Sequence, residues 1–261
     1  MSAEDMAAIL GLSQAALWTA TAVFLRVGAM MALLPVLGEA TIPARVRLAV
    51  GLALTLVVAP AVADRLPPPP EGPGALALLA LAEASTGLVF GFALRLLVMA
   101  LQMAATIAAQ ATSLSQMFGG APGTEPSPAM GHLLVAAALA LATLMGLHVR
   151  LAELAIASYD LIPAGAGPAP GALLEAGLGR IGAATALAFG LAAPFVAAAL
   201  LVNLLMGVMG RAMPQLMLSL IGAPALAMGS LLLLLAASPL LLGAWATAFG
   251  AALDAPLGGS P

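Results

Sequence analysis

Long apolar stretches recur along the chain, and they constrain its fold more than any other feature. Six of them run over about residues 8–34, 46–63, 75–110, 129–149, 180–208 and 215–253. Each is near or above the length of roughly 20 residues that an α-helix needs to cross the hydrocarbon core of a bilayer. The segments between them are rich in proline and glycine, which end helices. The sequence therefore predicts an all-α, multi-span integral membrane protein.

The composition excludes an ordinary soluble protein. Only 7% of the residues are charged and 63% are hydrophobic, whereas about 25% of the residues of a typical soluble domain are charged. One compact core cannot bury so much apolar surface, so much of it must face lipid or other apolar chains. The 8 basic residues, all Arg, form no basic patch, and the formal net charge is −3. We therefore expect membrane lipid as a partner and no nucleic acid.

Two of the apolar stretches, 75–110 and 215–253, are longer than one crossing needs. The second contains Pro224 and Pro239. We expect each to fold as a bent helix or a helical hairpin, which gives about six to eight apolar helices arranged as bent helical hairpins. We expect a single integral-membrane domain over residues 1–261.

Charged residues inside the apolar stretches need a partner or water, because an ionised side chain at the bilayer centre costs about 2.5–3.5 kcal/mol. Arg26 is one such residue. Glu83, Gly87, Gly91 and Arg95 follow one another every four residues and form one slowly winding stripe on a helix. The two glycines make a face that lets another helix approach closely. Two interpretations remain open, a contact with another subunit or hairpin, and internal packing within one chain.

Nothing in the sequence predicts catalysis, a metal or a cofactor. The chain has no Cys, and its 2 His residues, His132 and His148, lack the close ligands of a metal site. The Gly-rich string over 177–182 has the spacing of a dinucleotide-binding turn, but no strand pattern precedes it. No nucleophile elbow is present either. We therefore expect a protein that is not an enzyme and has no cofactor.

A polar loop, residues 109–128, combines Ser, Thr and Gln with Met117, Phe118, Gly119 and Gly120. Methionine fills irregular gaps, and glycine permits backbone shapes that other residues resist. The loop is suited to close an opening. A plain turn between two helices is the alternative.

Four stretches together resemble the FliR family, the R-type export-gate subunit of bacterial flagellar type III secretion, which has a homologous subunit in injectisomes. They cover residues 24–60, 83–96, 146–163 and 192–225. The last is the most specific, with Asn203, Arg211, Pro214 and Gln215 in the expected places. Because the stretches occur in the right order over nearly the whole chain, coincidence is a poor explanation.

The resemblance implies a non-enzymatic structural subunit of the flagellar export gate in the bacterial inner membrane, at the flagellar basal body. Such a subunit is present in one copy in a hetero-oligomer with several P-type (FliP) and Q-type (FliQ) subunits. The FlhB-type switch subunit and the FlhA-type export component are further implied partners. The gate would form and seal the pore through which unfolded flagellar proteins leave. An injectisome subunit and a secondary membrane transporter are the alternative functions.

The resemblance also implies roles for individual residues. The segment 109–128 would plug the pore, with Met117, Phe118, Gly119 and Gly120 as its gasket. Contacts between subunits or between hairpins would use a set of charged, small and polar residues: Arg26, Glu83, Gly87, Gly91, Arg95, Asn203, Arg211, Pro214 and Gln215.

Overall fold

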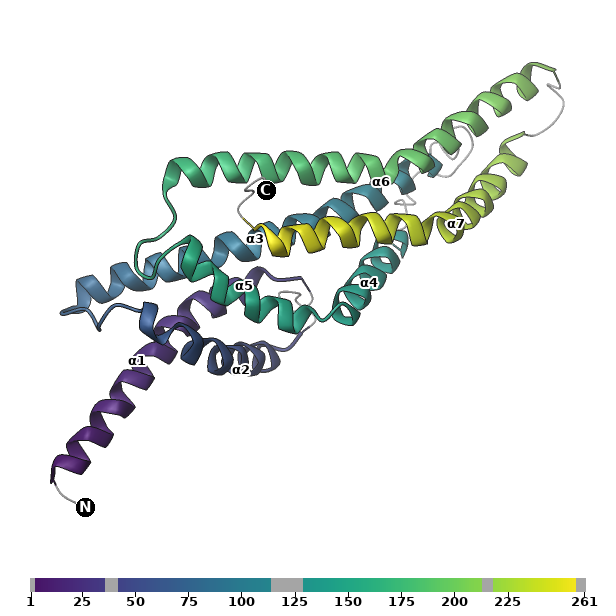
Figure 1. The fold of residues 1–261 in the computed structure, drawn as a ribbon. Coiled ribbons are helices and arrows are strands. Elements are labelled where there is room, and N and C mark those ends of the chain that lie inside the picture. Colours follow the sequence, from purple (N-terminus) through teal and green to yellow (C-terminus); the bar gives the residue numbers. More distant parts are fainter. Residues whose placement is uncertain (1–2, 36–41, 114–128, 213–217, 257–261) are drawn as a thin grey trace. The chain divides into compact units, whose positions relative to one another are not determined.

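The computed structural model describes residues 3–35, 42–113, 129–212 and 218–256. These residues form seven α-helices, one short 3-10 helix and no strand (Figure 1). The elements are α1 (Ala3–Leu33), α2 (Ala44–Val62), η1 (Ala63–Arg65), α3 (Pro73–Ser113), α4 (Ala129–Leu144), α5 (Leu147–Leu161), α6 (Pro170–Ala212) and α7 (Leu218–Asp254). The all-α fold is confirmed, with a helix number inside the expected range.

Proline occurs both at helix starts and inside helices. α3 begins at Pro73 and α6 at Pro170, where the missing N–H costs nothing because the first N–H groups of a helix have no partner in it. Pro194 lies inside α6, and α7 runs through Pro224 and Pro239. Residues 75–110 lie within α3 and residues 218–253 lie within α7, so the described part of each long stretch is one continuous helix rather than a hairpin.

The apolar stretch over 129–149 is broken near its end. α4 stops at Leu144, and Gly146 adopts a φ of 78°, a left-handed conformation that glycine adopts without strain. α5 follows and carries Arg150, Glu153 and Asp160, which is why apolar length alone did not predict it. The predicted loop 109–128 also begins differently, because residues 109–113 are the last turn of α3.

Within the described part of the chain, five helices are long and apolar enough to cross a membrane, and the broken pair α4–α5 makes a sixth if it counts as one span. The five lie within α1, α2 with η1, α3, α6 and α7. Six possible spans equal the lower limit of the six to eight apolar helices that the sequence predicts.

The chain divides into two compact units. Unit 1 comprises residues 1–95, 143–180 and 250–261, and unit 2 comprises residues 96–142 and 181–249. α3 and α6 run without interruption from one unit into the other. The expected single domain stays a prediction.

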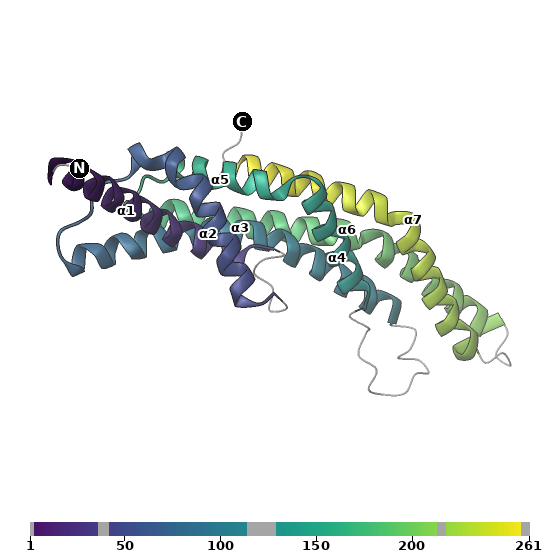
Figure 2. The same ribbon diagram turned by 90° about the horizontal axis from the view of Figure 1, so that it is seen from below.

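In unit 1, α2 packs against α1 and α5. The second half of α1 crosses the first half of α3 (Figures 1 and 2). The apolar core of unit 1 includes Val27, Met30, Val58 and Phe90, all fully buried. At the edge of the unit, the indole N–H of Trp18 donates to the Pro67 carbonyl at 3.0 Å.

In unit 2, the second half of α3 packs against α6 through small side chains. Ala100 of α3 and Ala184 and Ala188 of α6 are buried in one apolar cluster. α7, which runs opposite to α6 (Figure 2), adds Trp245, whose N–H donates to the Leu97 carbonyl at 3.0 Å. Small residues at such contacts allow helix backbones to approach closely, which is how helices pack in apolar surroundings.

Candidate functional site

A buried ion pair joins α1 to α3 in unit 1. Nε of Arg26 lies 2.7 Å from Oε2 of Glu83, and Nη2 lies 3.1 Å from Oε1. Both side chains are 0% exposed. Two parallel N–H···O bonds give this pair both strength and a fixed orientation. Two charges inside apolar stretches are therefore paired with each other within one chain.

α5 and the residue after it complete the surroundings of the guanidinium. Nη1 of Arg26 donates to Oγ of Ser158 at 3.2 Å and to the carbonyl of Ile162 at 3.0 Å. The guanidinium carbon lies 3.7 Å from the centre of the Tyr159 ring, within range of a cation–π interaction. The guanidinium of Arg26 thus contacts α3, α5 and Ile162, the residue that follows α5.

Glu83 holds the segment that follows α5. Its Oε1 accepts a hydrogen bond from the backbone N–H of Gly165 at 2.7 Å, and its Oε2 lies 3.5 Å from the hydroxyl of Tyr159. Gly165 and Gly167 have φ angles of 76° and 68°, which L side chains rarely adopt. The two glycines let residues 162–169, called the clasp segment below, lie directly against α3.

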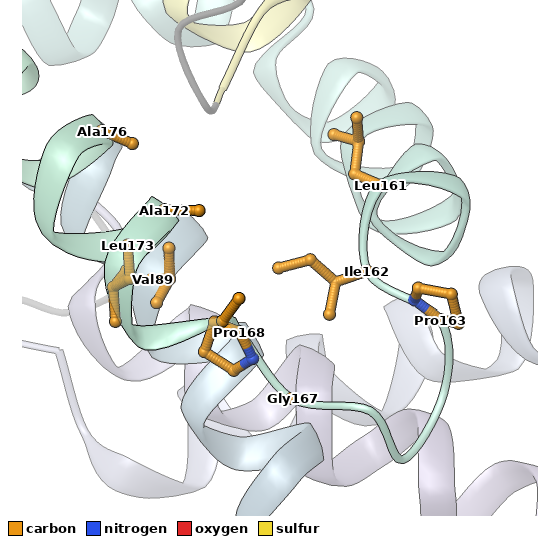
Figure 3. A pocket seen from close by; sticks show the side chains of 10 residues that line it. Val89, Leu161, Ile162, Pro163, Gly167, Pro168, Ala172, Leu173 and Ala176 are labelled. Atoms are coloured by element: carbon orange, nitrogen blue, oxygen red, sulfur yellow. The ribbon is translucent and has the colours of Figure 1, made fainter.

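The clasp segment forms one wall of an apolar pocket of about 280 Å³ (Figure 3). Figure 3 shows the Ile162 side chain extending toward Val89 and Pro168 across this pocket. Since the carbonyl of Ile162 accepts from Arg26, the buried charges also position a pocket wall. The lining is Val89, Leu161, Ile162, Pro163, Gly167, Pro168, Ala169, Ala172, Leu173 and Ala176.

Gly87 and Gly91 allow α1 and α3 to approach closely beside the ion pair. A Cβ on Gly91 would lie 2.6 Å from the carbonyl oxygen of Met30, and one on Gly87 would overlap the carbonyl oxygen of Arg26. Real Cβ atoms are not found at such distances. The glycine face of the predicted stripe therefore packs against α1 of the same chain.

Two exposed ion pairs lie elsewhere in unit 1. Nη1 of Arg65 is 3.0 Å from Oδ2 of Asp160, and Nη1 of Arg150 is 2.5 Å from Oδ1 of Asp254. The first links η1 to α5 and the second links α5 to the end of α7. All four side chains are at least 41% exposed, so each pair contributes at most about 1 kcal/mol.

The structure brings together only some of the predicted site residues. Arg26, Glu83, Gly87 and Gly91 form one cluster, and Arg95 is half-buried about one turn beyond Gly91 on α3. Two others lie on the part of α6 that belongs to unit 2, Asn203 half-buried and Arg211 exposed. The remaining predicted residues, Met117, Phe118, Gly119, Gly120, Pro214 and Gln215, lie outside the described residues.

Sequence reasoning assigned no role to Ser158, Tyr159 or Gly165. The first two are adjacent polar residues near the end of an otherwise leucine- and alanine-rich helix. Gly165 lies in a short segment rich in glycine and proline. The adjacent positions of Ser158 and Tyr159 near a helix end were a local signal, but no local sequence pattern connects these two residues to Arg26.

The described geometry offers no metal or nucleotide site. No group of three His, Asp or Glu side chains among the described residues could hold a metal ion. His132 and His148 are both exposed. The Gly-rich string over 177–182 is part of helix α6 rather than a phosphate-binding turn.

Comparison with known proteins gives two consistent results. The family model described as bacterial export proteins, family 1, matches residues 17–252. The flagellar biosynthetic protein FliR of Caulobacter vibrioides is 30% identical over 208 residues, which is 79% of this chain and 83% of that protein. The match includes the ion pair, the clasp segment and all five helices that could span a membrane. The chain is therefore a membrane protein that belongs to the family of bacterial export proteins, family 1.

Proposed function

We propose that this chain is a structural, non-enzymatic subunit of the flagellar type III protein export gate, located in the bacterial inner membrane at the flagellar basal body. The family match over residues 17–252 carries the proposal. The name of its Caulobacter relative, a flagellar biosynthetic protein, favours the flagellar branch over an injectisome.

The exposed apolar surface supports a role inside a larger assembly. Large aliphatic side chains are more than half exposed along α2, α6 and α7, for example Leu56, Leu204 and Leu235. Exposed apolar surface of this extent must be covered by lipid or by other subunits. We propose FliP-type and FliQ-type subunits as neighbours of a single copy of this chain, with the FlhB-type and FlhA-type components acting on the same gate.

Purification of the tagged chain from its native membrane in mild detergent tests the proposal. Mass spectrometry of what copurifies should identify several P-type and Q-type subunits per copy of this chain. Partners of the injectisome type would move the function to that machine. A chain recovered alone, as a monomer or homodimer, would favour a secondary transporter.

The predicted plug remains part of the proposal on sequence grounds alone. Met117 and Phe118 supply soft apolar contacts, and Gly119 and Gly120 supply backbone freedom. Deletion of residues 113–122 should leave the assembly intact but make cells leaky to small solutes. An intact assembly with an unchanged leak would contradict the plug role.

A further inference from the structure

The apolar pocket beside the clasp segment, called the clasp pocket below, is suited to one large apolar side chain. Every residue that lines it has an apolar side chain or none. Figure 3 shows Ala172 and Ala176 of α6 on one side of it and Leu161 and Ile162 on the other. Cavities of this kind are poor sites for water and hold apolar guests. The volume of about 280 Å³ is below the roughly 300–1,000 Å³ that enclose a whole drug-sized ligand.

The walls of the clasp pocket are held apart by contacts that do not depend on an occupant. Arg26 donates to the carbonyl of Ile162 at 3.0 Å, and Glu83 accepts from the backbone N–H of Gly165 at 2.7 Å. The clasp segment also contains two prolines, whose rings fix φ. A pocket that is already formed favours binding, because little conformational entropy is lost on association.

A cation with an unsatisfied donor lies one helical turn from the clasp pocket. Arg180 follows Ala176 by four residues on α6, which is about 6 Å along the helix. Its Nη2 donates to the carbonyl of Ala255 just after α7. Its Nε is buried and has no hydrogen-bond partner in the part of the chain that the structure describes. A buried donor without an acceptor is costly, and a carboxylate is the acceptor that fits a guanidinium best.

The surroundings of Arg180 favour a protein partner over an anionic lipid. Arg180 is half-buried, so a single acceptor can reach it from outside. Glu175 on the same helix is exposed, and Asp254, next to the Ala255 that Arg180 contacts, is 68% exposed. These two carboxylates repel a membrane surface that carries many negative charges. A protein segment can place one carboxylate at Arg180 alone.

We propose that the clasp pocket and Arg180 form a docking site for a segment of a neighbouring subunit. One large apolar side chain of that segment fills the pocket, and a carboxylate about one helical turn away binds Arg180. This inference rests on the proposed export-gate function and describes one contact within that assembly. Apolar anchors in pockets and arginines carry most of the binding free energy at protein interfaces. The two points should therefore govern this contact.

Site-specific photocrosslinking in the native membrane tests the contact. A photoreactive phenylalanine analogue replaces Leu173, which lines the clasp pocket, in the full-length tagged chain. The matched control carries the analogue in place of Leu178, which is 61% exposed on α6 but does not line the pocket. Mass spectrometry then identifies the peptide that each position captures.

We expect position 173 to capture a peptide of a copurifying subunit that has an Asp or Glu within about one helical turn of the crosslinked residue. Position 178 should capture a different peptide or none. A partner peptide without a carboxylate, a lipid adduct, an adduct with the chain's own residues 257–261, or the same peptide at both positions would each overturn the proposal. If gate subunits copurify but position 173 captures none of them, only the present inference fails. If no gate subunit copurifies with the parent chain, the proposed function itself fails.

A charge swap gives a second readout. Arg180→Glu should lower the amount of the captured subunit that copurifies by about tenfold or more, because it removes one partner of a desolvated charge pair. An Arg in place of the partner's captured carboxylate residue should restore it, which a purely structural role of Arg180 at the end of α7 would not allow. Arg65→Glu, at an exposed position of unit 1, is the matched control and should leave copurification unchanged.

Filling the clasp pocket tests the apolar half of the site. Ala176→Phe places a ring in the pocket and should lower copurification of the same subunit. If this variant does not reach the membrane, Ala172→Leu narrows the pocket at its exposed edge. Unchanged copurification in the filled variant or in Arg180→Glu would overturn the proposal.

Discussion

In unit 1 the helices meet around a fully buried ion pair, whereas in unit 2 the second half of α3 packs against α6 and α7 through apolar side chains, among them Ala100, Ala184 and Trp245. Arg26 and Glu83 are held by partners from α1, α3, α5 and the clasp segment. Trp245 makes one hydrogen bond and stacks on Phe249 with ring centres 4.8 Å apart.

The two kinds of packing differ in how strongly the stability of the unit depends on a single residue. A buried charge has a fixed set of partners, and the loss of one partner leaves the other desolvated and unpaired. An alanine contact spreads its free energy over many small interactions. We therefore expect single substitutions to disrupt unit 1 far more than unit 2.

The largest effect should come from breaking the ion pair. Glu83→Ala leaves Arg26 buried without its carboxylate, which should lower the free energy of unfolding by about 3–5 kcal/mol. Thermal unfolding in mild detergent, together with the amount of chain in the membrane, measures this loss. Glu153→Ala, at an exposed position on α5, is the matched control and should change little.

A charge-free replacement separates the role of charge from that of packing. The double variant Arg26→Met with Glu83→Leu should recover most of the lost stability, because apolar pairs of similar volume often replace buried ion pairs without cost. It should not restore the hydrogen bond that holds Gly165. Recovery of stability without recovery of partner binding would show that the clasp segment serves assembly. A double variant as unstable as Glu83→Ala would mean that the hydrogen bonds, rather than the charge balance, carry the stability.

The glycines of α3 provide the next largest effect. Gly87→Ala places a methyl group against the backbone of Arg26 and 3.0 Å from Cβ of Ala29, which should cost about 1–3 kcal/mol through overpacking. Gly190→Ala on α6 meets nothing within 4 Å and should gain about 0.5–1 kcal/mol from helix propensity. The two apparent melting temperatures should therefore move in opposite directions. A shift in the same direction would show that the close approach of α1 to α3 is not maintained in the assembled protein.

A smaller effect is expected in unit 2. Trp245→Phe keeps an aromatic ring but removes the N–H that donates to Leu97 and leaves a small cavity, so about 1–2 kcal/mol should be lost. The Leu97 carbonyl lies inside helix α3 and keeps its helical partner, which limits the cost. The change in melting temperature should stay below that of Glu83→Ala. A larger change would remove the contrast between the two units.

The sequence predicts which charged residues need a partner, but it does not identify the partner residues. Apolar length and glycine spacing are local patterns, and they located the helices and the small-residue face of Gly87 and Gly91. The ion pair joins residues 57 positions apart, and Arg26 reaches Ser158 across 132 positions. Such pairing depends on how the helices pack. The helix that follows the break at Gly146, α5, was missed because its charged residues lower its hydropathy, and the sequence prediction relied on apolar length.

The smallest effect should come from the exposed ion pair of unit 1. Arg65→Ala removes the contact with Asp160 and a hydrogen bond to the carbonyl of Ile156 at 3.3 Å. Both side chains of the pair are largely exposed, so the loss should be at most about 1 kcal/mol and should shrink further as salt screens the pair. Melting temperatures of the variant and the parent at low and high salt measure it. Arg65→Ala with an effect as large as Glu83→Ala would place Arg65 in a buried contact of the assembly, and burial rather than charge would then separate the two pairs.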